Sequence, residues 1–271
     1  MIFVELRKLY RRPRTWVSIG LLCGLPALVA VFLATTRVGT GQGQAPAFLS
    51  AVLANGSLFP AAALAIVLPV FLPVAVAVVG GDAIAGEASV GMLRYLLVRP
   101  AGRVRLLLAK LAALVTFVLV AVVSVVATSY LIGVSLFPAE AGQAPVGSVS
   151  GPALTPAQVI LRIGAAMCYV GFSMLGVGAI ALFLSTVTDS SLGATLGALA
   201  ALVGSQLLAT LDAAASVRPY LPTRYWLAWI DLFREPILWR DIQRGIGIQA
   251  VYLAVFLALA WANLVTKDIR S

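Results

Sequence analysis

The charged residues with the greatest chemical interest lie in residues 80–110, between two long apolar runs. If residues 83–98 form a helix, Glu87 and Arg94 fall within about 20° of each other on its surface, because successive residues turn by about 100°. Three leucines then cover the opposite side. Such a helix can rest its apolar side on the membrane and leave its charged side free to bind another protein. The pattern equally fits an interfacial helix whose charged side is only solvated.

Groups that would support catalysis or metal binding are missing from the sequence. There is no histidine, which excludes histidine-based triads, histidine-ligated metals and imidazole proton relays. Cys23 and Cys168 lie in apolar runs without CxxC spacing and are predicted to be small buried residues. None of the three lysines follows glycine, so a Walker A loop is absent. We therefore predict no catalytic residues, no metal site and no cofactor bound by this chain.

The composition predicts an all-α integral membrane protein that forms one domain over residues 1–271. The chain is 61% hydrophobic and 11% charged, with a mean hydropathy of +1.03, whereas soluble domains are about 25% charged. A helix needs about 20 apolar residues to cross a bilayer. Six runs meet this need and predict six transmembrane helices: 16–36, 58–79, 111–137, 163–184, 192–211 and 248–265.

The charge distribution predicts the orientation. Six crossings place both termini on one side, and the first two segments of that side, 1–14 and 80–110, hold most of its basic residues. The positive-inside rule then makes both termini cytoplasmic. Because the basic residues flank apolar runs, the net charge of +9 indicates membrane lipids as partners and not nucleic acid. Arginine outnumbers lysine, which is typical of a GC-rich bacterial genome, so we predict a bacterial plasma (inner) membrane.

Two segments outside the predicted spans have a distinct pattern. Residues 1–14 place apolar and basic side chains on opposite sides of a helix that Pro13 ends, which predicts an interfacial helix. Residues 212–247 form a long outer loop, either re-entrant or interfacial, which carries aromatic residues at helical spacing. These aromatic residues are Tyr225, Trp226, Trp229 and Phe233. We expect them at the headgroup level, on one or two short helices.

Proline and glycine positions suggest motion and assembly. Pro69 and Pro73, four residues apart, predict a kink in the second span, which is either static or a hinge. Pairs of glycines spaced by four residues let helices approach closely and are possible dimer contacts, although such spacings also arise by chance in a glycine-rich chain. These pairs are Gly20 with Gly24 and Gly193 with Gly197.

The stretch 80–110 resembles the signature of type-2 ABC exporter permeases, which reads as an acidic residue, Glu, a Gly-Thr-Leu step, a leucine-rich turn, Pro, Arg and Lys. The residues that carry this resemblance are Asp82, Glu87, Gly91, Leu93, Arg94, Leu97, Pro100, Arg103 and Lys110. Met92 departs from it, since the family usually has threonine there. Chain length, the basic N-terminus, six spans and the long loop before the last span also resemble the family.

The resemblance implies that two permease copies form an export pathway and that two separate ABC-type ATPase subunits bind ATP and Mg²⁺. A coupling helix within the cytoplasmic loop 81–105 would contact the ATPase. The implied coupling residues are Asp82, Glu87, Gly91, Arg94, Pro100 and Arg103. The apolar spans suit lipid-like, peptide or hydrophobic substrates. The alternatives are an ATP-independent channel or secondary transporter and a membrane-embedded enzyme.

Overall fold

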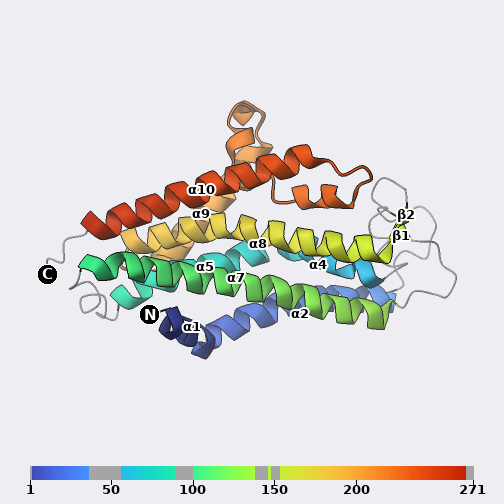
Figure 1. The fold of residues 1–271 in the computed structure, drawn as a ribbon, viewed down its shortest axis with the longest axis horizontal. Coiled ribbons are helices and arrows are strands. Elements are labelled where there is room, and N and C mark those ends of the chain that lie inside the picture. The colour runs from blue at the N-terminus through green and yellow to red at the C-terminus, as the bar shows by residue number, and fades with distance from the viewer. Residues whose placement is uncertain (1, 37–55, 90–99, 138–145, 148–152, 267–271) are drawn as a thin grey trace.

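A computed structural model describes residues 2–36, 56–89, 100–137, 146–147 and 153–266. Within them, six helices are long and apolar enough to cross a membrane, as the sequence predicts. These helices are α2 (Pro13–Thr36), α5 (Phe71–Ala88), α7 (Pro100–Leu136), α8 (Pro156–Val187), α9 (Ser191–Thr210) and α10 (Trp239–Thr266). They run side by side along the long axis of the molecule (Figure 1). Their length and composition fit a multi-pass membrane protein.

Helix α8 lies at the centre of the bundle and packs against α5, α9 and α10. The glycine pair Gly80 and Gly81 lets α5 approach both α8 and α9 closely. A Cβ atom on Gly80 would lie 2.9 Å from Cβ of Ala181 on α8, and one on Gly81 would lie 2.5 Å from Oγ1 of Thr195 on α9. Small residues therefore hold three helices together at one level, as is common where helices pack in lipid.

The predicted second span is interrupted. Residues 58–79 contain the end of a 3₁₀ turn, η1 (Gly56–Leu58), a short helix, α4 (Phe59–Val67), and the start of α5. The break falls at residues 68–70 and includes Pro69, so the predicted kink is a full interruption. The Gln206 amide of α9 donates to the Pro69 carbonyl at 2.9 Å. A polar side chain thus satisfies a backbone group that the break leaves free.

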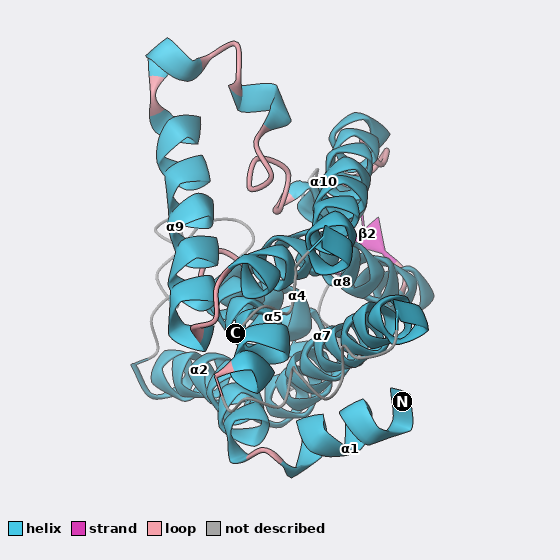
Figure 2. Cartoon of the chain, turned by 90° about the vertical axis from the view of Figure 1, so that its left-hand side faces the viewer, coloured by secondary structure: helices cyan, strands magenta, loops and turns pink. Residues whose placement is uncertain are grey.

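One end of the bundle gathers segments that are distant in the sequence. The short helix α1 (Ile2–Arg11) lies across this end, where α5 and α10 finish and α7 begins (Figures 1 and 2). Its apolar residues Ile2, Phe3 and Val4 are exposed, while Leu9 is buried against the bundle. The expected amphipathic helix is therefore present, and its contact with a membrane surface stays a prediction.

The opposite end carries the only strands among the described residues, β1 (Val146–Gly147) and β2 (Ala153–Leu154), which pair antiparallel. They lie in the connection between α7 and α8. The capping box of Thr155 and Gln158, in which each side chain bonds the other's backbone N–H, then starts α8.

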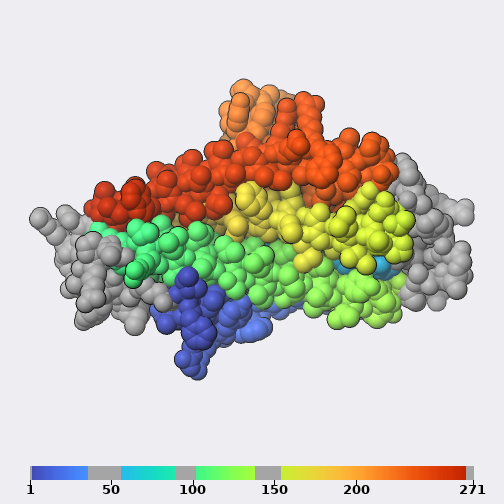
Figure 3. All heavy atoms as spheres, viewed as in Figure 1, coloured from blue at the N-terminus to red at the C-terminus, as the bar shows by residue number. Residues whose placement is uncertain are grey.

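The aromatic segment before α10 differs from the prediction. It contains three 3₁₀ turns, η2 (Asp212–Ala214), η3 (Arg218–Tyr220) and η4 (Ala228–Phe233), and no α-helix. Trp226, Trp229 and Phe233 are buried in the hydrophobic core and do not lie on an outer surface. The start of this segment, coloured orange, projects from the side of the bundle (Figure 3). The helical spacing correctly indicated that these aromatic residues lie on one side of the segment. That side packs against the bundle, so the residues are buried.

Candidate functional site: a charged cluster at the end of the bundle

A buried ion pair joins the end of α5 to α7. Lys110 Nζ lies 2.5 Å from Glu87 Oε1. The two side chains are 5% and 4% exposed, so neither charge is solvated by water to any useful extent. Burying a charge without a partner costs several kcal/mol, at roughly the scale of a protein's whole stability. The two residues therefore fix α5 and α7 relative to each other.

Helix α1 adds a second acid and a second base to this pair. Lys110 Nζ also donates to Glu5 Oε2 at 2.6 Å, and Lys8 Nζ donates to Glu87 Oε1 at 3.0 Å and to Glu5 Oε1 at 3.3 Å. Each lysine therefore contacts both carboxylates. We call Glu5, Lys8, Glu87 and Lys110 the charged quartet. It carries no net charge and pins the amphipathic helix to the bundle.

The environment of the quartet changes the pKa of its two α1 members. Burial alone would raise the pKa of Glu5, but the hydrogen bond and charge of Lys110, helped by Lys8, outweigh it and lower that pKa. Burial alone would lower the pKa of Lys8, but its bonds to Glu87 and Glu5 raise that pKa instead. Both shifts favour the charged forms of Glu5 and Lys8.

A second group of charges lies next to the quartet, around Asp82. Its carboxylate accepts hydrogen bonds from Arg12 and, at 2.8 Å, from the hydroxyl of Ser191. Arg14 approaches it at 4.0 Å. Arg12 and Arg14 flank the junction of α1 and α2, and Ser191 starts α9. Asp82 therefore ties α5 to the α1–α2 junction and to the start of α9 at the same end of the bundle.

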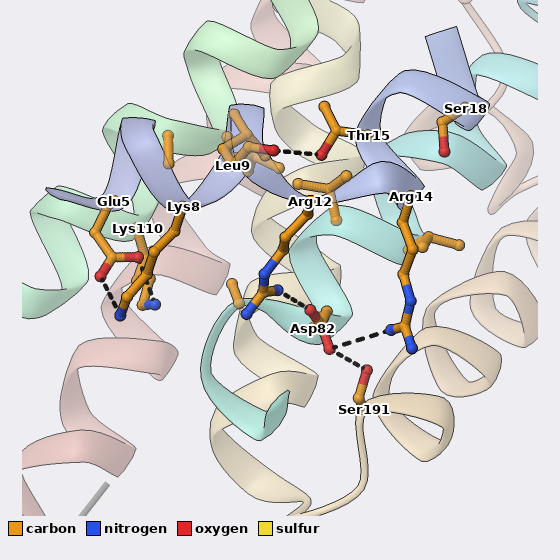
Figure 4. A pocket seen from close by; sticks show the side chains of 15 residues that line it. Glu5, Lys8, Leu9, Arg12, Arg14, Thr15, Ser18, Asp82, Lys110 and Ser191 are labelled. Atoms are coloured by element: carbon orange, nitrogen blue, oxygen red, sulfur yellow. Dashed lines mark hydrogen bonds and ion pairs between the residues drawn. The ribbon is translucent and has the colours of Figure 1, made fainter. Parts of the chain in front are cut away.

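The residues around Asp82 and three members of the quartet, all except Glu87, line a cavity of about 80 Å³ between α1, α2, α5, α7 and α9. Figure 4 shows Arg12 and Arg14 flanking Asp82, with Lys8 and Lys110 close to Glu5. The hydroxyl of Thr15 donates to the Leu9 carbonyl at 2.7 Å and closes the α1–α2 corner. The remaining lining includes apolar groups such as Val79 and Leu114. The cavity is thus lined by both charged and apolar side chains.

This arrangement is suited to holding helices together and to binding an ion or a charged group. Among the residues that the structure describes, no three histidine, cysteine or acidic side chains lie close enough to hold a metal ion. Glu87 Oε2 is buried and has no hydrogen-bond partner, since both lysines bond Oε1. The quartet therefore keeps one unused acceptor in a low-dielectric site.

The structure corrects the sequence prediction for Glu87. We expected a separate helix over residues 83–98 with Glu87 on a free charged side. Instead, α5 continues unbroken from the span to Ala88, which directs Glu87 at α7, where Lys110 neutralises it. Asp82 likewise lies inside α5 and is mostly buried. Neither carboxylate is free to contact another protein.

The other predicted coupling residues are placed as follows. Gly91 and Arg94 lie outside the described residues, and Pro100 is the first residue of α7. The Arg103 guanidinium donates to the carbonyls of Leu264 at 3.0 Å and Val265 at 2.7 Å. It thereby caps the C-terminal end of α10, which leaves carbonyl groups without helical partners. Arg103 therefore links α7 to α10.

The predicted hinge residues are prolines around the start of α5, and the predicted dimer residues are glycines of α2 and α9. Pro69 lies in the break between α4 and α5, and Pro73 lies in the first turn of α5. A Cβ atom on Gly20 or Gly24 would meet nothing within 4 Å, and one on Gly193 would meet only Ser190 of its own turn. Gly197 instead faces Leu184 of α8 at 3.3 Å. Three of the four glycines thus leave open space on the outside of the bundle.

Sequence reasoning did not identify Lys8 and Arg12 as partners of the α5 carboxylates, or Glu5 as a partner of Lys110. Their spacing on α1 places them on its polar side, but it does not show that this side faces the bundle. Lys110 gave the clearest signal, because it precedes a long uncharged run and a lysine inside such a helix needs an acidic partner.

The chain belongs to the family described as "Protein of unknown function (DUF2705)", whose model matches residues 29–270. The match covers the last third of α2 and all the later helices, including Asp82, Glu87 and Lys110, and it starts after α1. No curated protein matches the chain.

Proposed function

We propose that this protein is the membrane-spanning permease subunit of an ABC exporter and that a separate ATPase subunit powers it. The observation that best supports this proposal is the charged quartet. It joins an amphipathic helix to the ends of two long apolar helices, at the end of the bundle where α10 also finishes. A soluble partner bound at this end would act on all these helices together.

The quartet suits a mechanical role because it is buried and neutral. Breaking it would leave charges in a low-dielectric site, so α1, α5 and α7 are expected to move as one unit. The break at residues 68–70 separates this unit from α4. In the proposed mechanism, ATP binding by the partner shifts the unit, and the break acts as the hinge that opens the pathway.

The proposed docking surface for the ATPase is the segment that follows α5, with Gly91 and Arg94, together with the exposed end of α1 at Arg11. The signature resemblance supports this choice, and the burial of Glu87 and Asp82 directs it away from these two carboxylates. ATP and Mg²⁺ bind to the partner, because the chain lacks a Walker A loop. Both termini are then cytoplasmic, in a bacterial plasma membrane.

The pathway is proposed to form between two copies of the permease. Helices α2 and α9 are mostly exposed along their apolar lengths, which leaves a large apolar surface for a second copy or for lipid. A wall of aliphatic side chains suits a lipid-like, peptide or hydrophobic substrate better than a hydrated ion. Export is the direction that the resemblance implies.

Co-purification with a P-loop ATPase encoded beside this chain tests the proposal. We expect the ATPase to co-elute with the permease and the permease alone to hydrolyse no ATP. Arg94→Glu should weaken co-elution, whereas Arg240→Glu, an exposed arginine at the start of α10, should not. Substrate movement by the permease alone in vesicles would reject the proposal and favour a channel or secondary transporter.

A further inference from the structure

The cavity at the α1–α2 corner carries an unbalanced positive charge. Its cations and carboxylates, counted together with Glu87, which shares the lysines, are four basic and three acidic side chains. They are Lys8, Arg12, Arg14 and Lys110 against Glu5, Asp82 and Glu87. The quartet is neutral, so the excess lies in the other group, where two arginines face the single carboxylate of Asp82. This part of the cavity attracts an anion with one negative charge.

Arg14 has most of its hydrogen-bonding capacity free. Its nearest carboxylate oxygen is 4.0 Å away, beyond the length of a hydrogen bond, and its side chain is 77% exposed. Ser18, one turn along α2, also lines the cavity, and its hydroxyl makes no hydrogen bond among the described residues. Figure 4 shows Arg14 reaching down beside Asp82 while Ser18 lies along the same edge of α2. Guanidinium and hydroxyl donors of this kind suit phosphate oxygens.

The position of the cavity favours a lipid as the source of that anion. Arg14 and Ser18 lie in the first two turns of α2. Neighbouring residues of the same helix, such as Val17 and Leu21, are apolar and exposed. Helix α1 lies across the same end with its apolar residues exposed (Figure 2). In a membrane, this places the arginines at headgroup depth and the exposed side of α2 against acyl chains.

We propose that this cavity is a binding site for the phosphate of an anionic phospholipid, with Arg14 as its main contact and Arg12 as the second. The phosphodiester supplies the one negative charge that the cavity lacks, and the acyl chains lie along the outside of α2. The bound lipid would hold the α1–α2 corner in place. This assignment does not depend on the proposed ABC permease function.

Native mass spectrometry of the detergent-solubilised chain, titrated with phosphatidylglycerol, tests the site. We expect one saturable lipid, bound more tightly than phosphatidylcholine. Arg14→Gln should weaken phosphatidylglycerol binding by about tenfold, the loss typical of one charge-assisted contact. Arg7→Gln is the matched control, since Arg7 is an exposed arginine of α1 outside the cavity. It should change binding by less than about twofold.

Two further measurements distinguish a lipid site from general surface charge and from a site for a soluble phosphate ester. Asp82→Asn removes the carboxylate that competes for both arginines, so phosphatidylglycerol should bind more tightly. Glycerol 3-phosphate at the same concentration should not displace the lipid. Equal losses in Arg14→Gln and Arg7→Gln would reduce the effect to general surface charge and overturn the site. Displacement by glycerol 3-phosphate would overturn the lipid assignment in favour of a soluble phosphate ester.

Discussion

Lys110 of α7 and Glu87 of α5 form an ion pair of 2.5 Å in which both side chains are at least 95% buried. The pair connects two long apolar helices at the end of the bundle where the amphipathic helix α1 docks. Because each charge depends on the other for stabilisation, the pair should be far more sensitive to the loss of one partner than to the loss of both.

A double-mutant cycle on this pair follows directly. Lys110→Met leaves Glu87 buried with only Lys8 beside it, and we expect a loss of about 3 kcal/mol in the free energy of unfolding. Glu87→Gln should cost a similar amount. The double variant should lose clearly less than the sum of the two, as measured by chemical unfolding in mixed micelles. Additive losses would show that the two charges do not interact.

The docking of α1 should depend on pH in a defined way. The lowered pKa of Glu5 means that its contribution is complete above the ordinary value of 4.5 and is lost as the pH falls through the lowered pKa. The raised pKa of Lys8 means that its contribution is complete below 10.5 and is lost as the pH rises through the raised pKa. The strength of α1 docking should therefore be constant between pH 4.5 and pH 10.5.

Hydrogen exchange of the α1 amides, corrected for the intrinsic effect of pH, measures this docking. Glu5→Gln serves as the control. It should lower the protection of the α1 amides at neutral pH, and it should remove part of the loss of protection that occurs in acid. Protection that falls steadily between pH 6 and pH 8 would contradict the charge assignment, since neither group titrates there.

The sequence predicted the six apolar helices because composition and length alone decide which segments cross a membrane. It did not predict the extension of α5 to Ala88. The residues that follow the apolar run include Asp82 and Glu87, and only basic side chains from α1, the α1–α2 junction and α7 explain why these carboxylates are buried there. Pairing between helices that are distant in the sequence is invisible to a pattern read along one helix.

The aromatic segment before α10 illustrates a second limit. Trp226, Trp229 and Phe233 recur at a spacing that fits an amphipathic helix, and the backbone there forms 3₁₀ turns that keep a similar grouping. Whether the grouped rings face lipid or protein depends on what covers them. In this chain the aromatic residues join the core of the bundle, so their burial was not predictable from spacing.

Gln206, a polar residue in the apolar helix α9, is predicted to stabilise the break between α4 and α5. Gln206→Leu removes the donor to the Pro69 carbonyl. We expect a loss of about 1–3 kcal/mol in unfolding free energy, the cost of a backbone group left unpaired. Gln243→Leu on the exposed side of α10 is the control and should change stability by less than about 0.5 kcal/mol. Equal effects would show that the bond to Pro69 contributes nothing specific.

Cysteine labelling in intact cells tests the orientation. Gly147 and Ala101 lie at opposite ends of the bundle, on β1 and at the start of α7. With cytoplasmic termini, Gly147→Cys and Gly43→Cys should react with an impermeant reagent and Ala101→Cys should not. Ala213→Cys probes the long loop before α10 and should also react, because Ala213 is exposed. Labelling of Ala101→Cys alone would invert the topology.

The last prediction concerns assembly. Gly20 on α2 and Gly193 on α9 have no atoms of other helices within 4 Å of an added Cβ, so leucine at either position should leave the single chain folded. If these glycines let a second copy approach closely, Gly20→Leu and Gly193→Leu should each convert a dimer into monomers by native mass spectrometry. Gly247 on α10 has equally open surroundings, and Gly247→Leu is therefore the matched control. A dimer that survives the first two changes, or is lost equally in all three, would place the contact elsewhere on the bundle.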